Sequence, residues 1–219
     1  VRPPSLAPAD AVDFFIAAGP ERLDPAALLP CFGCFLSPPS PDCPPDCTPA
    51  EEEVAAGKKE AIRFLQHSIS RQACTEGAVH NTLLTFLVER CAEDPAALTR
   101  YVAGAGMSSH PGRAHYDQHL AFRLCEEKGA LKAAIQILCD LGDFEYAIDL
   151  ALKADDLPTA KLVVEKVEEE DEVLKRALWR KIARGVVERG FGVSVTEAQI
   201  ETEAAAMKAQ LQQEAAAAA

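Results

Sequence analysis

Four cysteines near the start of the chain have a spacing that could hold a metal ion. Cys31 and Cys34 are separated by two residues, and Cys43 and Cys47, a little further along, by three. Four thiolates are the ligand number that a tetrahedral zinc site requires. However, the first pair flanks phenylalanines at an apolar helix end, and prolines surround the second pair. We therefore predict ordinary buried or loop cysteines and no metal site, with structural zinc as the alternative.

The other cysteines do not form a catalytic pattern. Cys74, Cys91, Cys125 and Cys139 lie at helical, core-like spacing, and no histidine and acid are placed to activate one of them. We expect them to pack in the core. The sequence has neither a glycine-rich phosphate loop after a strand nor a GxSxG nucleophile motif, and its carboxylates are scattered over polar faces. We predict no catalytic residues, no cofactor and no small-molecule substrate, so the protein is not expected to be an enzyme.

Three histidines lie within ten residues of one another. These are His110, His115 and His119, and the last two are expected to share one helix face. A metal site would need a third ligand or the HExxH pattern, and neither is present. We predict capping or surface roles for all three.

A basic stripe follows one face of a helix near the end of the chain. Arg176, Arg180 and Arg184 are spaced four residues apart, opposite an apolar seam from Leu174 to Val186. The stripe could meet an acidic partner or lipid headgroups. We expect a solvated helix face instead, because a cluster of acidic residues just before the helix supplies compensating charge. Trp179 is predicted to anchor the core, with an interface role as the alternative.

Composition limits the classes of partner and compartment. The chain has 219 residues, a net charge of −12, 48% hydrophobic residues and only 6% aromatic residues. This charge gives no general attraction to nucleic acid or to an anionic bilayer. No apolar run is long enough to span a membrane, and no secretory signal opens the chain, so we expect a reducing, cytoplasmic setting and at most peripheral membrane association.

The elements that carry these residues are predicted to be helices. Apolar residues recur every three to four positions, and the breaks carry capping chemistry: an aspartate can cap a helix start, and a glycine can adopt the left-handed conformation after a helix end. The capping positions are Asp24, Asp94, Asp143 and Asp156, and the glycines are Gly129 and Gly142. Helix hairpins that cannot bury their own apolar faces are expected to stack into an α-solenoid, above all from Tyr116 to Arg189.

Several unlike motifs also occur in one order between His115 and Val187. They are His115-Tyr116-Asp117, Ala121-Phe122-Arg123-Leu124-Cys125, Ala147-Ile148-Asp149-Leu150-Ala151-Leu152, Glu169-Glu170-Asp171-Glu172, Leu178-Trp179, Lys181-Ile182-Ala183-Arg184 and Val186-Val187. Weaker upstream matches are Ala61-Ile62-Arg63-Phe64, Val79-His80-Asn81, Leu83-Leu84, Arg22-Leu23-Asp24 and Leu28-Leu29-Pro30. In order and spacing these resemble the deep orange family, also called vacuolar protein sorting-associated protein eighteen or Pep three. The resemblance covers most of residues 10 to 189.

The resemblance implies an α-solenoid of the clathrin-heavy-chain-repeat type, within the class C core of the HOPS and CORVET tethering complexes. It implies the other class C subunits as partners, peripheral membrane association through the complex, and a location on late endosomes and vacuoles or lysosomes. Two departures stand out. A proline- and cysteine-bearing segment at 36–57 looks like an insertion, and the family's C-terminal RING is absent, so we expect a fragment.

The expected organisation has four parts. They are a helical hairpin at 1–35, a flexible loop at 36–57, an α-solenoid at 58–190, and a linker with a terminal helix at 191–219. In that terminal helix, residues Ile200, Ala204, Met207 and Leu211 are spaced as in a short coiled-coil seam, which we expect to dock on a partner or to fray. The expected function is a non-enzymatic scaffold for vesicle docking and fusion. A generic helical-repeat adaptor or coat protein, or the non-catalytic part of a RING ubiquitin ligase, is the alternative.

Overall fold

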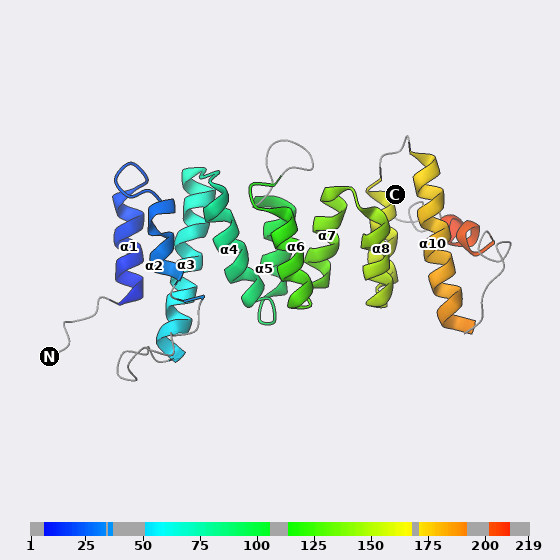
Figure 1. Ribbon diagram of the computed structural model, residues 1–219, viewed down its shortest axis with the longest axis horizontal. Coiled ribbons are helices and arrows are strands. Elements are labelled where there is room, and N and C mark those ends of the chain that lie inside the picture. Colours follow the sequence, from blue (N-terminus) through cyan, green and yellow to red (C-terminus); the bar gives the residue numbers. More distant parts are fainter. Residues whose placement is uncertain are drawn as a thin grey trace. The chain divides into compact units, whose positions relative to one another are not determined.

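The chain folds into helices that form two compact units. The computed structural model describes residues 7–33, 35–36, 51–105, 114–167, 171–191 and 202–210. Unit 1 comprises residues 1–130 and unit 2 residues 131–219. Within the described ranges every regular element is a helix (Figure 1), so the all-α prediction is confirmed. The boundary between the units falls inside the expected 58–190 region, and the four-part division stays a prediction.

Unit 1 is built on a long central helix and its neighbours. Its elements in chain order are α1 (Pro8–Ala18), the short 3-10 helix η1 (Ala26–Leu28), α2 (Leu29–Gly33), α3 (Glu51–Gln72), α4 (Gly77–Glu89), α5 (Pro95–Arg100), the π-helical turn η3 (Tyr101–Ala105) and α6 (Gln118–Glu127). Helix α3 packs against α1, α2 and α4, and α4 packs against α5 and α6. The helices of unit 1 therefore bury apolar faces against one another, as expected for stacked hairpins.

The core of unit 1 centres on the aromatic side chain of Phe64. Phe64 is 1% exposed, and its ring lies 6.1 Å from that of Phe15 in α1 and 5.5 Å from that of Phe32 in α2, measured between centroids. Edge and tilted arrangements at these separations are favourable for aromatic pairs. One residue of α3 therefore ties the first two α-helices to the centre of the unit.

The described part of unit 2 contains four α-helices and a further helical segment. These are α7 (Leu131–Leu141), α8 (Phe144–Lys153), α9 (Leu157–Glu165), α10 (Glu172–Phe191) and the helix at 202–210. Helix α8 packs against α7, α9 and α10, and α10 also packs against α9. The predicted apolar seam of α10 faces this core: Leu178 and Ile182 are fully buried, and Trp179 is 9% exposed. Its role as a core anchor is confirmed.

Predicted caps and turns are present at the starts of α5, α8 and α9 and at the ends of α6 and α7. The carboxylates of Asp94, Asp143 and Asp156 each accept a hydrogen bond from the backbone N–H three residues on, at 3.0 to 3.2 Å. These bonds satisfy amides that have no partner inside the helix. Gly129 and Gly142 have φ of 70° and 80°, the left-handed conformation that ends a helix. The breaks between helices thus arise from local chemistry.

Two segments differ from expectation. Helix α3 begins at Glu51, so the end of the expected 36–57 loop is helical, because the glutamates and alanines there are good helix formers. The remaining loop residues 37–50 lie outside the described residues. His115 and Tyr116 precede α6 instead of lying on it, because Asp117 caps that helix by accepting bonds from the N–H groups of His119 and Leu120.

No helix in the described part of the chain is long and apolar enough to cross a membrane.

Candidate interaction surfaces

Three of the four cysteines considered as a possible zinc site lie outside the described residues. They are Cys34, Cys43 and Cys47, whereas Cys31 is exposed in the middle of α2. Among the described residues, no group of three or more histidines, cysteines or acids is placed to hold a metal ion. The absence of a metal site stays a prediction.

The cysteines predicted to be core residues divide into two pairs. Cys125 and Cys139 are buried, and burial raises the pKa of their thiols to about 12 and about 11. A thiol must lose its proton to act as a nucleophile, so these two are inert packing groups near neutral pH. Cys74 and Cys91 are only partly buried. Core packing is thus confirmed for the first pair and incomplete for the second.

The histidine prediction needs a correction. His115 and His119 do not share a helix face: His119 lies in the first turn of α6, and His115 lies before the helix and packs on α4. There its ring centroid is 4.9 Å from that of His80. A hydrogen bond of 2.8 Å from the N–H of Asp117 to Asn81 Oδ1 holds the same segment on α4. His110 lies outside the described residues.

His80 is a buried polar residue that sequence analysis missed. It is 1% exposed, with Nε2 2.9 Å from the carbonyl oxygen of Cys74 and Nδ1 2.7 Å from the hydroxyl of Tyr101. A carbonyl only accepts, so Nε2 carries the proton and Nδ1 accepts from the Tyr101 hydroxyl. Burial lowers the pKa of His80, and the nearby His115 lowers it further, against a raising effect of the Cys74 carbonyl. The only signal in the sequence was the motif Val79-His80-Asn81, which says nothing about this network.

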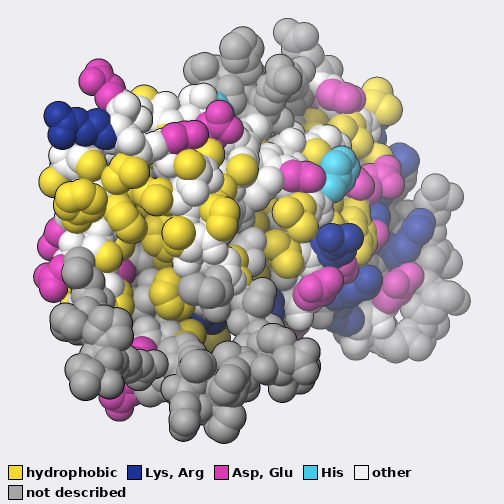
Figure 2. Space-filling view, turned by 60° about the vertical axis from the view of Figure 1, so that its left-hand side comes forward, with side chains coloured by type: hydrophobic (Ala, Val, Ile, Leu, Met, Phe, Trp, Pro, Cys, Tyr) yellow, Lys and Arg dark blue, Asp and Glu magenta, His cyan; other side chains and the backbone are white. Residues whose placement is uncertain are grey.

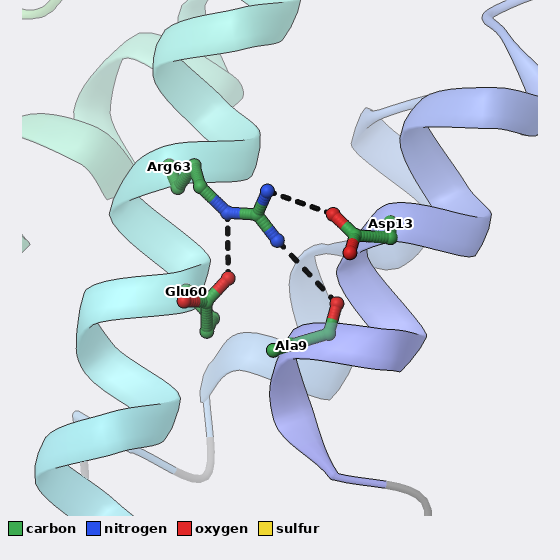
Figure 3. Close-up of polar contacts among 4 residues, drawn as sticks. All are labelled: Ala9, Asp13, Glu60 and Arg63. Atoms are coloured by element: carbon green, nitrogen blue, oxygen red, sulfur yellow. Dashed lines mark hydrogen bonds and ion pairs between the residues drawn. The ribbon is translucent and has the colours of Figure 1, made fainter.

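An arginine joins α1 to α3 at the surface of unit 1. The Arg63 guanidinium lies 2.8 Å from Asp13 of α1 and 2.6 Å from Glu60 on its own helix, and it donates to the carbonyl oxygen of Ala9 at 3.4 Å (Figure 3). These acceptors raise its pKa further above the ordinary value, so the charge is permanent. Because the side chain is 43% exposed, the contacts define how α1 meets α3 more than they add stability.

Apolar side chains remain exposed on α1. Phe14 is 64% exposed although its ring centroid lies only 6.3 Å from that of the half-buried Phe15. Figure 2 turns the N-terminal helices toward the viewer and shows hydrophobic side chains gathered on this face. Apolar side chains that gather in one exposed patch, unlike a single exposed residue, are typical of a surface that meets another protein.

The basic stripe of α10 divides between two grooves. Arg176 and Arg180 line a groove formed by α9, α10 and the helix at 202–210, and Arg184 lines a second groove between α8 and α10. All three side chains are exposed, as predicted. Beside the second groove, Lys181 pairs with Asp149 at 2.8 Å and Arg189 pairs with Asp155. Charges on this helix therefore serve both internal contacts and an open groove.

None of these arrangements assembles a nucleophile, a base and a substrate cavity among the described residues. What they offer is recognition: exposed apolar area, a cationic groove and helices held rigidly by caps and buried aromatic rings. Comparison with known proteins agrees with this interpretation. A family model described as VPS18, alpha-solenoid domain, second half, matches residues 5–187.

The chain belongs to the VPS18 family. Among relatives, it is 34% identical over 181 residues to the Vacuolar protein sorting-associated protein 18 homolog of Danio rerio, which covers 83% of this chain. It is 30% identical over 143 residues, or 65% of this chain, to the Vacuolar membrane protein pep3 of Schizosaccharomyces pombe. The match to the Vacuolar sorting protein 18 of Arabidopsis thaliana is 29% over 136 residues, or 61% of this chain.

The matched regions span 16%, 15% and 13% of these three VPS18 relatives, so the chain corresponds to a small part of each. No solved structure matches the chain. Family membership confirms the predicted family and the α-solenoid class, since the stacked helices lie within the matched residues 5–187.

Proposed function

We propose that the chain is a non-enzymatic scaffold segment of a membrane-tethering complex that acts in vacuolar protein sorting. The match of residues 5–187 to the VPS18 solenoid model is the observation that carries this proposal. Two relatives are named Vacuolar membrane protein pep3 and Vacuolar sorting protein 18, and these names point to the same process. In finer terms, the proposal is docking and fusion between endosomes and vacuoles or lysosomes, as part of the HOPS and CORVET complexes.

The proposed mechanism is rigid presentation of docking surfaces. Buried side chains such as Phe64 in unit 1 and Leu178 in unit 2 fix the helices of each unit. Each capped break sets the direction of the following helix without help from a partner. A scaffold of this kind contributes by holding binding surfaces in place, so its partners are proteins, here the other class C subunits.

The proposed membrane association is indirect and occurs through the complex. A net charge of −12 opposes attraction to the anionic lipids of a cytoplasmic leaflet. The groove of α10 is a local exception to this negative charge, and Phe14 is an exposed apolar residue. Both are suited to protein surfaces of matching chemistry. The proposed location is therefore cytoplasmic, on late endosomes and vacuoles or lysosomes, and bound there by partners.

The experiment that tests the proposal is capture of purified class C subunits by the immobilised chain. Circular dichroism first establishes that the immobilised protein is helical. An unrelated helical-repeat protein of similar size serves as the matched control for non-specific capture. Binding of at least one subunit to the chain and not to the control is the expected result. A folded chain that captures none of them contradicts the tethering role, and selective binding of a coat component instead would favour a generic adaptor.

A further inference from the structure

A groove in unit 2 has the form of a docking site. It has a volume of about 520 Å³ and lies between α9, α10 and the helix at 202–210. Its lining residues are Val164, Glu165, Glu172, Lys175, Arg176, Trp179, Arg180, Ala204, Ala205 and Lys208. This volume falls in the range of pockets that enclose a ligand or a few side chains of a bound peptide. All of its walls belong to unit 2.

The charge around the groove is opposite to that of the whole chain. Lys175, Arg176, Arg180 and Lys208 stand around it, against the two carboxylates of Glu165 and Glu172. The chain as a whole carries −12. One of the two carboxylates is partly compensated, because Glu172 lies 3.9 Å from Lys208. The groove is therefore a local positive site on an acidic protein, and local fields of this kind select ligands by charge.

The cations of α10 have different uses along the helix. In the second half of α10, Lys181 and Arg189 pair with Asp149 and Asp155 of unit 2. Lys175 and Arg176, by contrast, form no ion pair with any described residue. These two cations and Arg180 stand near Lys208, and the two carboxylates of the groove, Glu165 and Glu172, offset only part of this positive charge. An acidic ligand would offset the rest.

The floor of the groove is apolar. Trp179 and Val164 are 9% and 2% exposed and contribute the deeper surface, and the small side chains of Ala204 and Ala205 form part of the opposite wall. Tryptophan and arginine together are the residue types most enriched at the energetic centres of protein interfaces. A ligand that fits must therefore carry negative charge at its edges and an apolar group in the middle.

We propose that this groove binds an acidic segment of a partner protein. Carboxylates of the segment contact Lys175, Arg176 and Arg180, and an apolar side chain between them packs over Trp179 against Ala204. A compact lipid phosphate fits less well, because it carries no apolar group to pack over Trp179 between the cations of the groove. The inference rests on the proposed role of the chain as a protein-docking scaffold, and it names the chemistry of one partner surface.

Trp179 makes the test direct because it is the single tryptophan of the chain. Two synthetic peptides are titrated while its fluorescence is followed. One has glutamates and aspartates around a central leucine, and the other has the matching glutamines and asparagines. We expect only the acidic peptide to shift the emission, with affinity that falls as salt rises from about 0.05 M to about 0.3 M, since salt screens exposed charge pairs.

Charge reversal locates the binding site. The double variant Lys175→Glu with Arg176→Glu is expected to bind the acidic peptide at least about tenfold more weakly, because attraction becomes repulsion. Arg184→Glu, which reverses one exposed charge on the same helix outside the groove, is the control, and the single variant Arg176→Glu matches it in charge. Arg184→Glu should change the affinity by less than about threefold, because salt screens most of the effect of a charge outside the groove. Glu172→Gln, which removes a repelling carboxylate, should bind more tightly, and circular dichroism checks that all variants keep their helix content.

Three outcomes would overturn the proposal. The first is equal binding of the neutral peptide, and the second is undiminished binding by the double variant. The third is binding of vesicles that contain phosphatidylserine, lost in the double variant, when neither peptide binds. If the chain captures class C subunits but fails these peptide tests, the groove proposal is wrong and the proposed tethering role stands. If the chain binds the acidic peptide but captures no subunit, the tethering role is wrong and the groove proposal stands.

Discussion

His80 stabilises unit 1 in its neutral form. Its ring joins the segment that follows α3, through the carbonyl of Cys74, to the hydroxyl of Tyr101 in η3. A protonated ring would have two donors, and the acceptor position that now receives the Tyr101 hydroxyl would be lost. Burial also disfavours the charged ring, so the pKa of His80 lies below its ordinary value of 6.5. The unfolded chain therefore binds this proton more readily than the folded one.

This linkage predicts that the protein loses stability as the pH falls. The contribution of His80 is present above the unfolded pKa near 6.5 and is lost as the pH falls from there through the lower folded value. The urea midpoint of the wild type should decrease between about pH 7.5 and about pH 5.5. In His80→Gln, which keeps a donor toward Cys74 but does not titrate, the decrease should be smaller. His119→Gln, at an exposed position, should behave like the wild type, and an equal slope in all three proteins would contradict the role of His80.

Asp156 accepts more hydrogen bonds than any other predicted helix cap. Its Oδ1 accepts from the N–H of Thr159 at 3.1 Å and its Oδ2 accepts from the Thr159 hydroxyl at 2.7 Å. These bonds favour the charged form and lower the pKa of Asp156. Stability from this carboxylate is thus present above its ordinary pKa and is lost in acid.

Removal of this cap should have a cost of its own. Asp156→Ala is expected to lower the free energy of unfolding by about 1 kcal/mol, whereas Asp156→Asn, which keeps an acceptor, should lower it by much less. Urea unfolding at neutral pH measures both. If alanine and asparagine prove equivalent, the cap does not determine where α9 begins.

At the scale of elements, a glycine lets the end of the first hairpin meet α3. A Cβ atom at Gly57 would lie 2.4 Å from the ring of Phe35, too close for any atom. At Gly33 a Cβ would meet nothing within 4 Å. Gly57 thus provides the space into which the Phe35 ring fits, and the contact brings residues from two separate elements together.

A double-mutant cycle tests this fit. Alanine is the better helix former by about 1 kcal/mol, so Gly57→Ala should stabilise α3 in a Phe35→Ala background, where the ring is gone. With Phe35 present, the same change should be neutral or destabilising, because the ring must move. Gly33→Ala gives the matched reference without a clash. Thermal unfolding of the four proteins gives the coupling, and a value near zero would mean that Phe35 does not pack on Gly57.

Local chemistry made some elements predictable and others not. The breaks at Asp94, Asp143 and Gly142 follow from residues next to them in sequence, and the apolar seam of α10 follows from its own periodicity. The position of His115 and the space at Gly57 depend on partners far along the chain, so spacing alone could not reveal them. The groove lies between these cases: Arg176 and Arg180 were visible as a stripe, but Lys208 joins them only through the packing of another helix.

For the molecule as a whole, each unit has a core of its own. Phe64 belongs to the core of unit 1 and Trp179 to that of unit 2. Truncation of a buried aromatic side chain to alanine costs about 3 to 5 kcal/mol. Phe64→Ala should therefore speed amide hydrogen exchange mainly in α1, α2 and α3. Trp179→Ala should do so mainly in α9 and α10.

Hydrogen exchange followed by mass spectrometry separates the two units directly. Val173→Ala, which trims an 83% exposed side chain on α10, is a control that should change neither unit. Equal acceleration of both units by either core variant would show that the two cores open together. An unchanged protein in Trp179→Ala would mean that this side chain is not buried as described.

The contacts of Arg63 with Asp13 and Ala9 join positions that are 50 and 54 residues apart in the sequence. The segment between α1 and α3 is therefore a closed loop, because the contacts of Arg63 hold its two ends together. The entropy of closing such a loop grows only with the logarithm of its length, by about 0.6 kcal/mol for each doubling. Evolution can therefore lengthen or shorten the proline-bearing stretch before α3 at little thermodynamic cost while α1 and α3 keep their register.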